Sequence, residues 1–205
     1  MFSGIVQAVG AIERVEALAQ GVRLTVDAGA LSLSDTKVGD SIAMNGACMT
    51  ATSISGNRFT VDVSRESLDV TAGLGAPGKV NLEKAMALGD RIDGHLVTGH
   101  VDGVGEVTAF EALGESTRLE IRAPRELARY IARKGSITVD GVSLTVNRVE
   151  DEADGARFEV NLIPHTLEVT TLSRLAAGAQ VNLEIDLVAR YIERVLTASK
   201  QAQFQ

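Results

Sequence analysis

Cysteine, proline and tryptophan are scarce in this chain of 205 residues, which contains one cysteine, three prolines and no tryptophan. Because Cys48 is the only cysteine, the chain has no internal disulfide framework and no cysteine metal cluster. The chain also lacks an uncharged apolar run near the ~20 residues that a membrane helix needs. Its N-terminus, MFSGIVQAVG, has no charged leader of the signal-peptide type. We therefore expect a cytoplasmic protein with no membrane segment.

Basic charge is also limited, with 20 Lys and Arg against 27 Asp and Glu and a net charge of −7. No basic cluster stands out, so we expect no nucleic-acid surface. The sequence has no GxxxxGK[ST] phosphate loop, no dinucleotide fingerprint after a strand and no GxSxG nucleophile motif. His95 and His100 lack the partners of a set such as HExxH, so we expect no metal site.

What the chain does contain is an internal repeat. Residues 40–52, DSIAMNGACMTAT, and residues 135–147, GSITVDGVSLTVN, both alternate polar and apolar residues around an Asn-Gly or Asp-Gly pair. This pattern predicts two β-hairpins with tight turns. Gly46 and Gly141 differ by 95 positions, and the offset becomes 99 at later matches. Because the motifs keep the same order, we predict two copies of one domain, residues 1–87 and 88–186, followed by a third segment, residues 187–205.

Each copy is predicted to consist mostly of strands. Alternation is clear in residues 22–27, 59–63 and 116–122, and many short strands separated by Gly and Asp turns favour a closed antiparallel barrel. Residues 125–134 have the apolar spacing of a helix. Residues 187–205 are predicted to form a C-terminal helix and tail, with Asp186 as N-cap and one apolar stripe along the helix. That stripe must pack on a barrel or on another subunit.

Candidate functional residues are mostly small polar side chains at matching places in the two copies. Each taken alone also has a structural interpretation, because threonines favour strands and a lone cysteine is often a small buried hydrophobe. The differences between the copies are more informative, since they indicate two pockets of common shape with different polar groups. The matched pairs are His100 with Ile5, Ser143 with Cys48, Thr145 with Thr50, Thr166 with Ser67, and His165 with Glu66.

Six stretches resemble riboflavin synthases of the trimeric, two-barrel type: MFSGIV, NGACMT, DGVSLTV, GHLVTGHVDG, IPHTLEVTTL and VNLEIDLVARYIERVL. The resemblance covers essentially the whole chain in order. The departures are small: Ser3 stands where threonine is usual, and Ala47, Met49 and Ala51 replace larger or branched residues.

The resemblance implies an all-β protein with short helices, namely two tandem six-stranded antiparallel Greek-key barrels plus a C-terminal helix. It implies that each barrel binds one 6,7-dimethyl-8-ribityllumazine and that chains form a homotrimer through residues 187–205. It places the active site between the first barrel of one chain and the second barrel of its neighbour. There a four-carbon unit passes between two lumazines, giving riboflavin and 5-amino-6-ribitylamino-uracil, without cofactor or metal. It leaves lumazine synthase as a candidate partner.

The resemblance also assigns site residues. The catalytic candidates are His100, Ser143, Thr145, Cys48 and Ser41. Because the lumazine C7 methyl is acidic, a modest base such as His100 suffices, while hydroxyl groups position ring oxygens or a water. Either Cys48 or a water could add to the acceptor ring. The substrate-binding candidates are Gly4, Ile5, Val6, Cys48, Met49, Thr50, Asp62, Val63, Ser64, Arg65, Glu66 and Ser67 in the first copy, and Gly99, His100, Val101, Lys134, Ser143, Leu144, Thr145, Asn161, Leu162, Ile163, Pro164, His165 and Thr166 in the second.

Two alternative functions can be distinguished from this one. A non-catalytic lumazine- or flavin-binding protein could lose the polar groups of one barrel, whereas this chain keeps them in both. A flavin-dependent reductase of similar barrel type would need a nicotinamide-binding α/β domain. The sequence leaves open which barrel holds the donor and which the acceptor.

Overall fold

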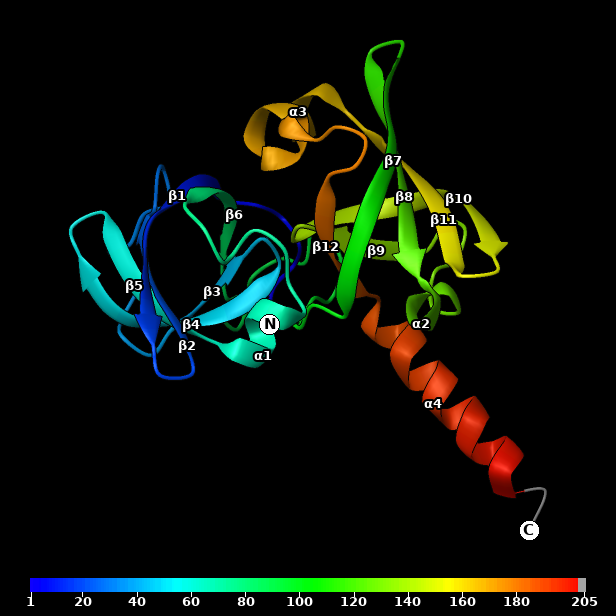
Figure 1. Cartoon of the computed structure of the whole chain (residues 1–205), viewed down its shortest axis with the longest axis horizontal. Helices are drawn as coiled ribbons and strands as arrows, with labels where there is room; N and C mark the ends of the chain where they lie inside the picture. The colour runs from blue at the N-terminus through cyan, green and yellow to red at the C-terminus, as the bar shows by residue number, and fades with distance from the viewer. Residues whose placement is uncertain (203–205) are drawn as a thin grey trace.

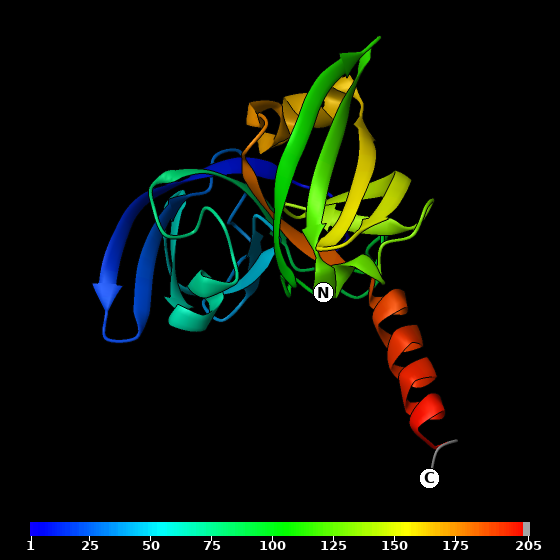
Figure 2. The same cartoon turned by 45° about the vertical axis from the view of Figure 1, so that its right-hand side comes forward.

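The computed structural model describes the backbone of residues 1–202 and the side chains of residues 1–199, so that residues 203–205 of the predicted tail lie outside the described part. The chain forms two closed antiparallel barrels of six strands each, and a long C-terminal helix projects from the second barrel (Figure 1). Figure 2 shows the hairpin of β7 and β8 at the end of the second barrel opposite to that helix. The predicted fold class is confirmed.

The two barrels share one topology. Neighbouring strands in the first follow the order β1-β2-β5-β4-β3-β6, and the second repeats this cyclic order as β7-β8-β11-β10-β9-β12. This non-sequential order is that of a Greek key. The strands of the first barrel are β1 (Ala8–Leu18), β2 (Gly21–Asp27), β3 (Ser41–Met44), β4 (Ala47–Ser55), β5 (Arg58–Ser64) and β6 (Gly78–Lys84). Those of the second are β7 (Gly103–Leu113), β8 (Ser116–Pro124), β9 (Ser136–Val139), β10 (Val142–Glu152), β11 (Gly155–Leu162) and β12 (Gln180–Ile185).

Both predicted hairpin turns are present, between β3 and β4 and between β9 and β10. Asn45 and Gly46 have φ values of 45° and 84°, and Asp140 and Gly141 have 47° and 78°. Two successive positive φ values define the type I′ turn that Asn-Gly and Asp-Gly favour. The turn chemistry therefore determines the register of both hairpins.

Short helices connect the strands: α1 (Arg65–Asp69), α2 (Arg125–Ala128), α3 (Pro164–Val169) and the 3-10 helix η1 (Thr171–Arg174). The prediction of a helix over residues 125–134 was wrong in its length, since α2 ends at Ala128. Leu127 and Ile131 are both buried in the core of the second barrel, but the N–H groups of Tyr130 and Ile131 donate across tight i to i+3 turns. The apolar spacing came from two residues that reach the same core along an irregular path.

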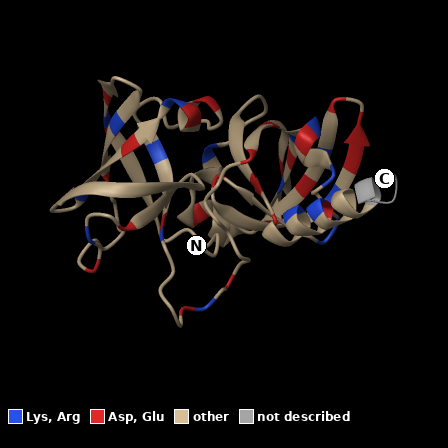
Figure 3. Ribbon diagram, turned by 90° about the horizontal axis from the view of Figure 1, so that it is seen from below, with Lys and Arg blue, Asp and Glu red and all other residues tan. Residues whose placement is uncertain are grey.

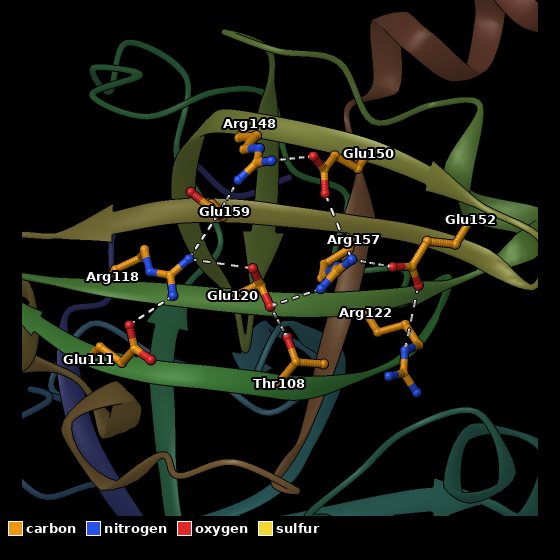
Figure 4. Close-up of polar contacts among 10 residues, drawn as sticks. All are labelled: Thr108, Glu111, Arg118, Glu120, Arg122, Arg148, Glu150, Glu152, Arg157 and Glu159. Atoms are coloured by element: carbon orange, nitrogen blue, oxygen red, sulfur yellow. Dashed lines mark hydrogen bonds and ion pairs between the residues drawn. The ribbon is translucent and has the colours of Figure 1, made fainter.

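The outer face of the second barrel carries a network of ion pairs across β7, β8, β10 and β11 (Figure 4). Arg118 bonds Glu111 at 2.8 Å and Glu159 at 2.9 Å, and Arg157 bonds Glu152 at 2.7 Å. Cross-strand pairs of opposite charge support strand pairing. Across the described residues, acidic and basic positions are interspersed rather than gathered by sign (Figure 3).

Helix α4 (Leu187–Ala202) begins where predicted, because Asp186 Oδ1 accepts the Val188 N–H at 2.9 Å. Two ion pairs attach its polar side to the second barrel, Arg190 to Asp102 at 2.6 Å and Glu193 to Arg129 at 2.8 Å. The apolar stripe faces outward, and its side chains are each more than half exposed: Val188, Tyr191, Ile192, Val195 and Leu196. None of the helices within residues 1–202 is long and apolar enough to cross a membrane.

Candidate active site

Two short segments cross between the barrels. The Ser143 N–H donates to Gly4 O at 2.7 Å, and the Cys48 N–H donates to Gly99 O at 2.7 Å. Val6 packs against the core of the second barrel, and Val101 packs against the core of the first. The segment that precedes each barrel therefore lies on the hairpin of the other barrel.

These crossings depend on glycine. Gly4 and Gly99 have φ values of +76° and +79°, and a Cβ on either would lie 2.7 Å from the Ser143 Cβ or 2.6 Å from the Cys48 Cβ. Such contacts are far closer than carbon atoms tolerate. The close approach of backbone to strand is thus possible only without a side chain at these two positions.

A buried glutamate holds each crossing segment. Glu83 accepts bonds from the Ser3 N–H at 2.7 Å, the Ser3 hydroxyl at 2.8 Å and the Gly4 N–H at 3.1 Å. Glu184 accepts from the Thr98 N–H and hydroxyl, both at 2.7 Å, and from the Gly99 N–H. Burial raises the pKa of both carboxyls, and these hydrogen bonds oppose the shift. Ser3, which replaces a usual threonine, makes the same hydroxyl bond as Thr98.

The first barrel carries a pocket of about 330 Å³ in which Cys48 and His100 come together. This grouping differs from the one expected by repeat, which put His100 beside Ser143. The exchange of segments is the reason, since residues 99–101 lie against β4 of the first barrel. The pocket is lined by Ala47, Cys48, Met49, Glu66, Ser67, Val70, Thr71, Gly99, His100 and Val101. Sequence reasoning did not assign Ala47, Val70 or Thr71 to the site, because no polar contrast between the copies marks them.

On the second barrel, Ser143 contacts a histidine that sequence reasoning considered only as a metal ligand. Ser143 Oγ lies 2.7 Å from His95 Nδ1. Burial lowers the pKa of His95, and the nearby charge of Asp186 opposes this shift, so the neutral imidazole is favoured. Comparison of the two copies could not identify His95, because at the offset of 95 no residue of the first copy aligns with it.

Other first-copy candidates lie away from the pocket of Cys48. Ser41 and Thr50 are cross-strand neighbours, and Ser41 lines a separate hollow of about 300 Å³. Ile5 lines a hollow of about 490 Å³ beside the linker between the barrels. Asp62 is ion-paired with Arg23 at 2.7 Å. Val63 is a core residue, Ser64 caps α1, and Arg65 pairs with Asp69.

The second-copy candidates follow the same elements of the second barrel. Thr145 is exposed on β10, and Leu144 is half-buried beside Ser143. Lys134 has a φ of +67° and donates its N–H to Val146 O at 2.7 Å. The final group runs from the end of β11 into α3: Asn161, buried Leu162, exposed Ile163, Pro164 at the start of the helix, exposed His165 and half-buried Thr166.

No group of three or more His, Cys, Asp or Glu side chains in the described part of the chain could hold a metal ion. The pocket offers the imidazole of His100, the thiol of Cys48, the carboxylate of Glu66 and the hydroxyl groups of Ser67 and Thr71. These groups can move a proton and hydrogen-bond a polar heterocycle.

Comparison with known proteins identifies relatives for both barrels. A family model described as "Lumazine binding domain" matches residues 3–85 and again residues 98–186. The chain is 43% identical to the riboflavin synthase of Photobacterium phosphoreum, over 98% of this chain and 91% of that protein. It is 46% identical to the riboflavin synthase of Mycobacterium bovis, over 97% of this chain and all of that protein. Among solved structures, LumP complexed with riboflavin is similar, with a TM-score of 0.77 and 27% identity over 90% of this chain and 99% of that chain.

Proposed function

The chain belongs to the riboflavin synthase family, and from this premise we propose how its two barrels divide the work of that reaction. The enzyme is a transferase that moves a four-carbon unit between two molecules of 6,7-dimethyl-8-ribityllumazine. One molecule becomes riboflavin and the other leaves as 5-amino-6-ribitylamino-uracil. The observation that carries this function is the match of riboflavin synthases along 97–98% of this chain at 43–46% identity.

We assign one lumazine to the pocket that contains Cys48 and His100. In this assignment the imidazole of His100 moves the proton of the acidic C7 methyl. Glu66 and Ser67 lie at the start of α1 on one wall of the pocket. Their side chains suit hydrogen bonds to the ribityl hydroxyls. Cys48, or a water in its place, is the candidate for addition to the acceptor ring.

We assign the second lumazine to the surface that carries Ser143 and Thr145, with His165 and Thr166 of α3 on its ribityl side. Each of the two sites on one chain lies on its own barrel. Transfer requires the two lumazines to be held together in a fixed relative orientation. A neighbouring chain would bring its second barrel to the first barrel of this one.

A homotrimer meets this requirement, and we propose that α4 forms its contact. Five apolar side chains of α4 are each more than half exposed in the single chain. A stripe of this kind is typical of a subunit interface. A cytoplasmic location and an association with lumazine synthase complete the proposal.

The proposed function has a direct test. Purified protein is incubated with the lumazine alone, and riboflavin is followed by its fluorescence while the uracil product is quantified in parallel. We expect one riboflavin for each uracil released, because the two products come from one transfer. A non-catalytic binding protein would bind the lumazine and form neither product. This chain retains polar groups in both barrels, which favours the enzyme over the binding protein.

A further inference from the structure

The turns of the two hairpins meet back to back between the barrels. A Cβ added to Gly46 would lie 2.9 Å from Gly141 N, and one added to Gly141 would lie 2.7 Å from Gly46 N. The two turns occupy equivalent positions in the repeat, so their contact has an approximate two-fold relation. Beside this contact, two buried side chains reach from one barrel to the other.

Asn81 on β6 and Asn182 on β12 make that passage, and they are 2% and 1% exposed. Asn81 Nδ2 donates to Asp140 O at 2.9 Å, and Asn182 Nδ2 donates to Asn45 O at 3.0 Å. Each asparagine therefore binds the turn of the opposite barrel. Within its own barrel, each donates its backbone N–H to the side chain of the turn residue.

Each asparagine also holds a second segment of the opposite barrel. Asn182 Oδ1 accepts the Ala72 N–H at 2.7 Å, and its Nδ2 donates to Ala72 O at 3.2 Å. Asn81 Oδ1 accepts the Thr171 N–H at 2.8 Å. Ala72 follows α1 in the first barrel, and Thr171 follows α3 in the second. The amide of one barrel thus fixes the chain that leaves the short helix of the other.

The segment held by Asn182 forms a wall of the first pocket. Val70 and Thr71, directly before Ala72, line the cavity of Cys48 and His100. The Thr71 hydroxyl donates to Ser67 O at 2.6 Å, which ties the held segment to the start of α1. The Thr170 hydroxyl makes the equivalent bond to Thr166 O at 2.6 Å in the second barrel. A path of hydrogen bonds therefore runs from each buried asparagine to the helix on the opposite barrel.

We propose that Asn182 is a positioning residue for the ligand pocket of the first barrel, and that Asn81 has the same role for the site on the second barrel. This inference rests on the proposed function, because it assumes that α1 and α3 border the two ligand sites. Removing the Asn182 amide leaves the Ala72 N–H and two carbonyl groups without their partners. A buried donor left unsatisfied destabilises the arrangement that buries it, so the segment should move toward water and widen the pocket.

The single cysteine supplies a reporter that is specific for the first pocket. Cys48 lines that pocket and is half-buried, so a chromogenic thiol reagent can follow its modification while riboflavin is titrated. Riboflavin should slow the modification of the wild-type protein, and the concentration for half protection measures affinity at this pocket alone. The matched variants are Asn182→Ala and Asn81→Ala. Each removes a bond to the opposite turn and a bond to the segment after the opposite short helix, and Asn182→Ala also removes the bond to Ala72 O.

We expect Asn182→Ala to raise the half-protecting concentration about tenfold, the scale of one net hydrogen bond. Asn81→Ala should change it less than about twofold. A role limited to holding the barrels together would move both values equally, and that result would overturn the inference. If Asn182→Ala does not fold, Asn182→Ser is measured instead: its one short hydroxyl cannot replace all the bonds of the amide and adds no buried charge, so a shift in the same direction is expected. Failure of riboflavin to protect wild-type Cys48 would instead refute the assignment of the pocket itself.

Discussion

The turn of the second hairpin predicts a pH dependence of stability that one substitution should remove. Asp140 is 7% exposed, and burial raises its pKa from 3.8 to about 7, opposed by the hydrogen bond from the Asn182 N–H. In the unfolded chain the carboxyl returns to a pKa of about 3.9. Because the folded-state pKa is the higher of the two, the native protein binds this proton more tightly than the unfolded chain does. This contribution to stability is complete below about pH 4 and is lost as the pH rises to about 7.

The magnitude follows from the shift. A difference of about 3 pKa units corresponds to a loss of about 4 kcal/mol in the free energy of unfolding above about pH 7. Between about pH 4 and pH 7 the slope attributable to Asp140 is about 1.4 kcal/mol per pH unit. Few other single groups can contribute a change of this size, since most substitutions alter stability by about 0.5–3 kcal/mol.

Asp140→Asn is a suitable perturbation because the first barrel already uses asparagine at the equivalent position. Asn45 has a φ of 45° against 47° for Asp140. Its Oδ1 accepts the Asn81 N–H at 2.8 Å, as the Asp140 Oδ1 accepts the Asn182 N–H at 2.8 Å. The variant therefore keeps the turn and its hydrogen bond and loses only the titrating group. We expect it to be more stable than wild type by up to about 4 kcal/mol near pH 8, with the gain shrinking steadily toward about pH 4.

The assay is urea unfolding followed by circular dichroism at several pH values and one protein concentration. The quantity to compare is the difference in the free energy of unfolding between variant and wild type, because Glu83 and Glu184 are present in both and their effects cancel. Asn45→Asp is the matched control, since it places a second carboxyl in the equivalent buried turn and should add a new loss of stability at high pH. Parallel pH curves for wild type and Asp140→Asn would refute the reasoning.

Three further predictions concern the site and the assembly. His100→Gln should lower turnover about 10²-fold or more without loss of lumazine binding, because the variant lacks the titrating group. Cys48→Ser should keep most of the activity. Near-normal turnover of His100→Gln at saturating lumazine would show that His100 only binds the substrate. Ile192→Asp on α4 should convert trimers to folded monomers in sedimentation and reduce activity with them, and an intact trimer would count against the helix as the contact. Gly99→Ala should displace the segment that carries His100 and abolish activity, because its Cβ would lie 2.6 Å from the Cys48 Cβ. Gly56→Ala, also at positive φ but with no atom of the described residues within 4 Å of its Cβ, should remain active.

Much of the fold could be predicted from the sequence because it depends on local patterns. Asn-Gly and Asp-Gly pairs select type I′ turns through the φ values of two adjacent residues, whatever surrounds them. Strand alternation and the Asp186 cap also depend on near neighbours in the chain. The offset of 95 between the copies, which becomes 99 at later matches, predicted two copies of one domain because the motifs keep the same order. A prediction from a local pattern fails where two different structures can produce that pattern. Leu127 and Ile131 have helical spacing, yet they reach the same core along an irregular path after a short helix.

The composition of the site depended on the tertiary structure. The repeat placed His100 with Ser143, whereas the exchange of segments puts His100 beside Cys48 and leaves Ser143 in contact with His95. The local sequence is compatible with His100 beside either Ser143 or Cys48. Glycine at positions 4 and 99 would let each crossing segment pack closely on either hairpin. The choice between them is made by the packing of one barrel on the other, through the buried bonds of Glu83, Glu184 and the two crossing asparagines. These contacts join residues far apart in the chain, so no window of sequence contains the information that selects them.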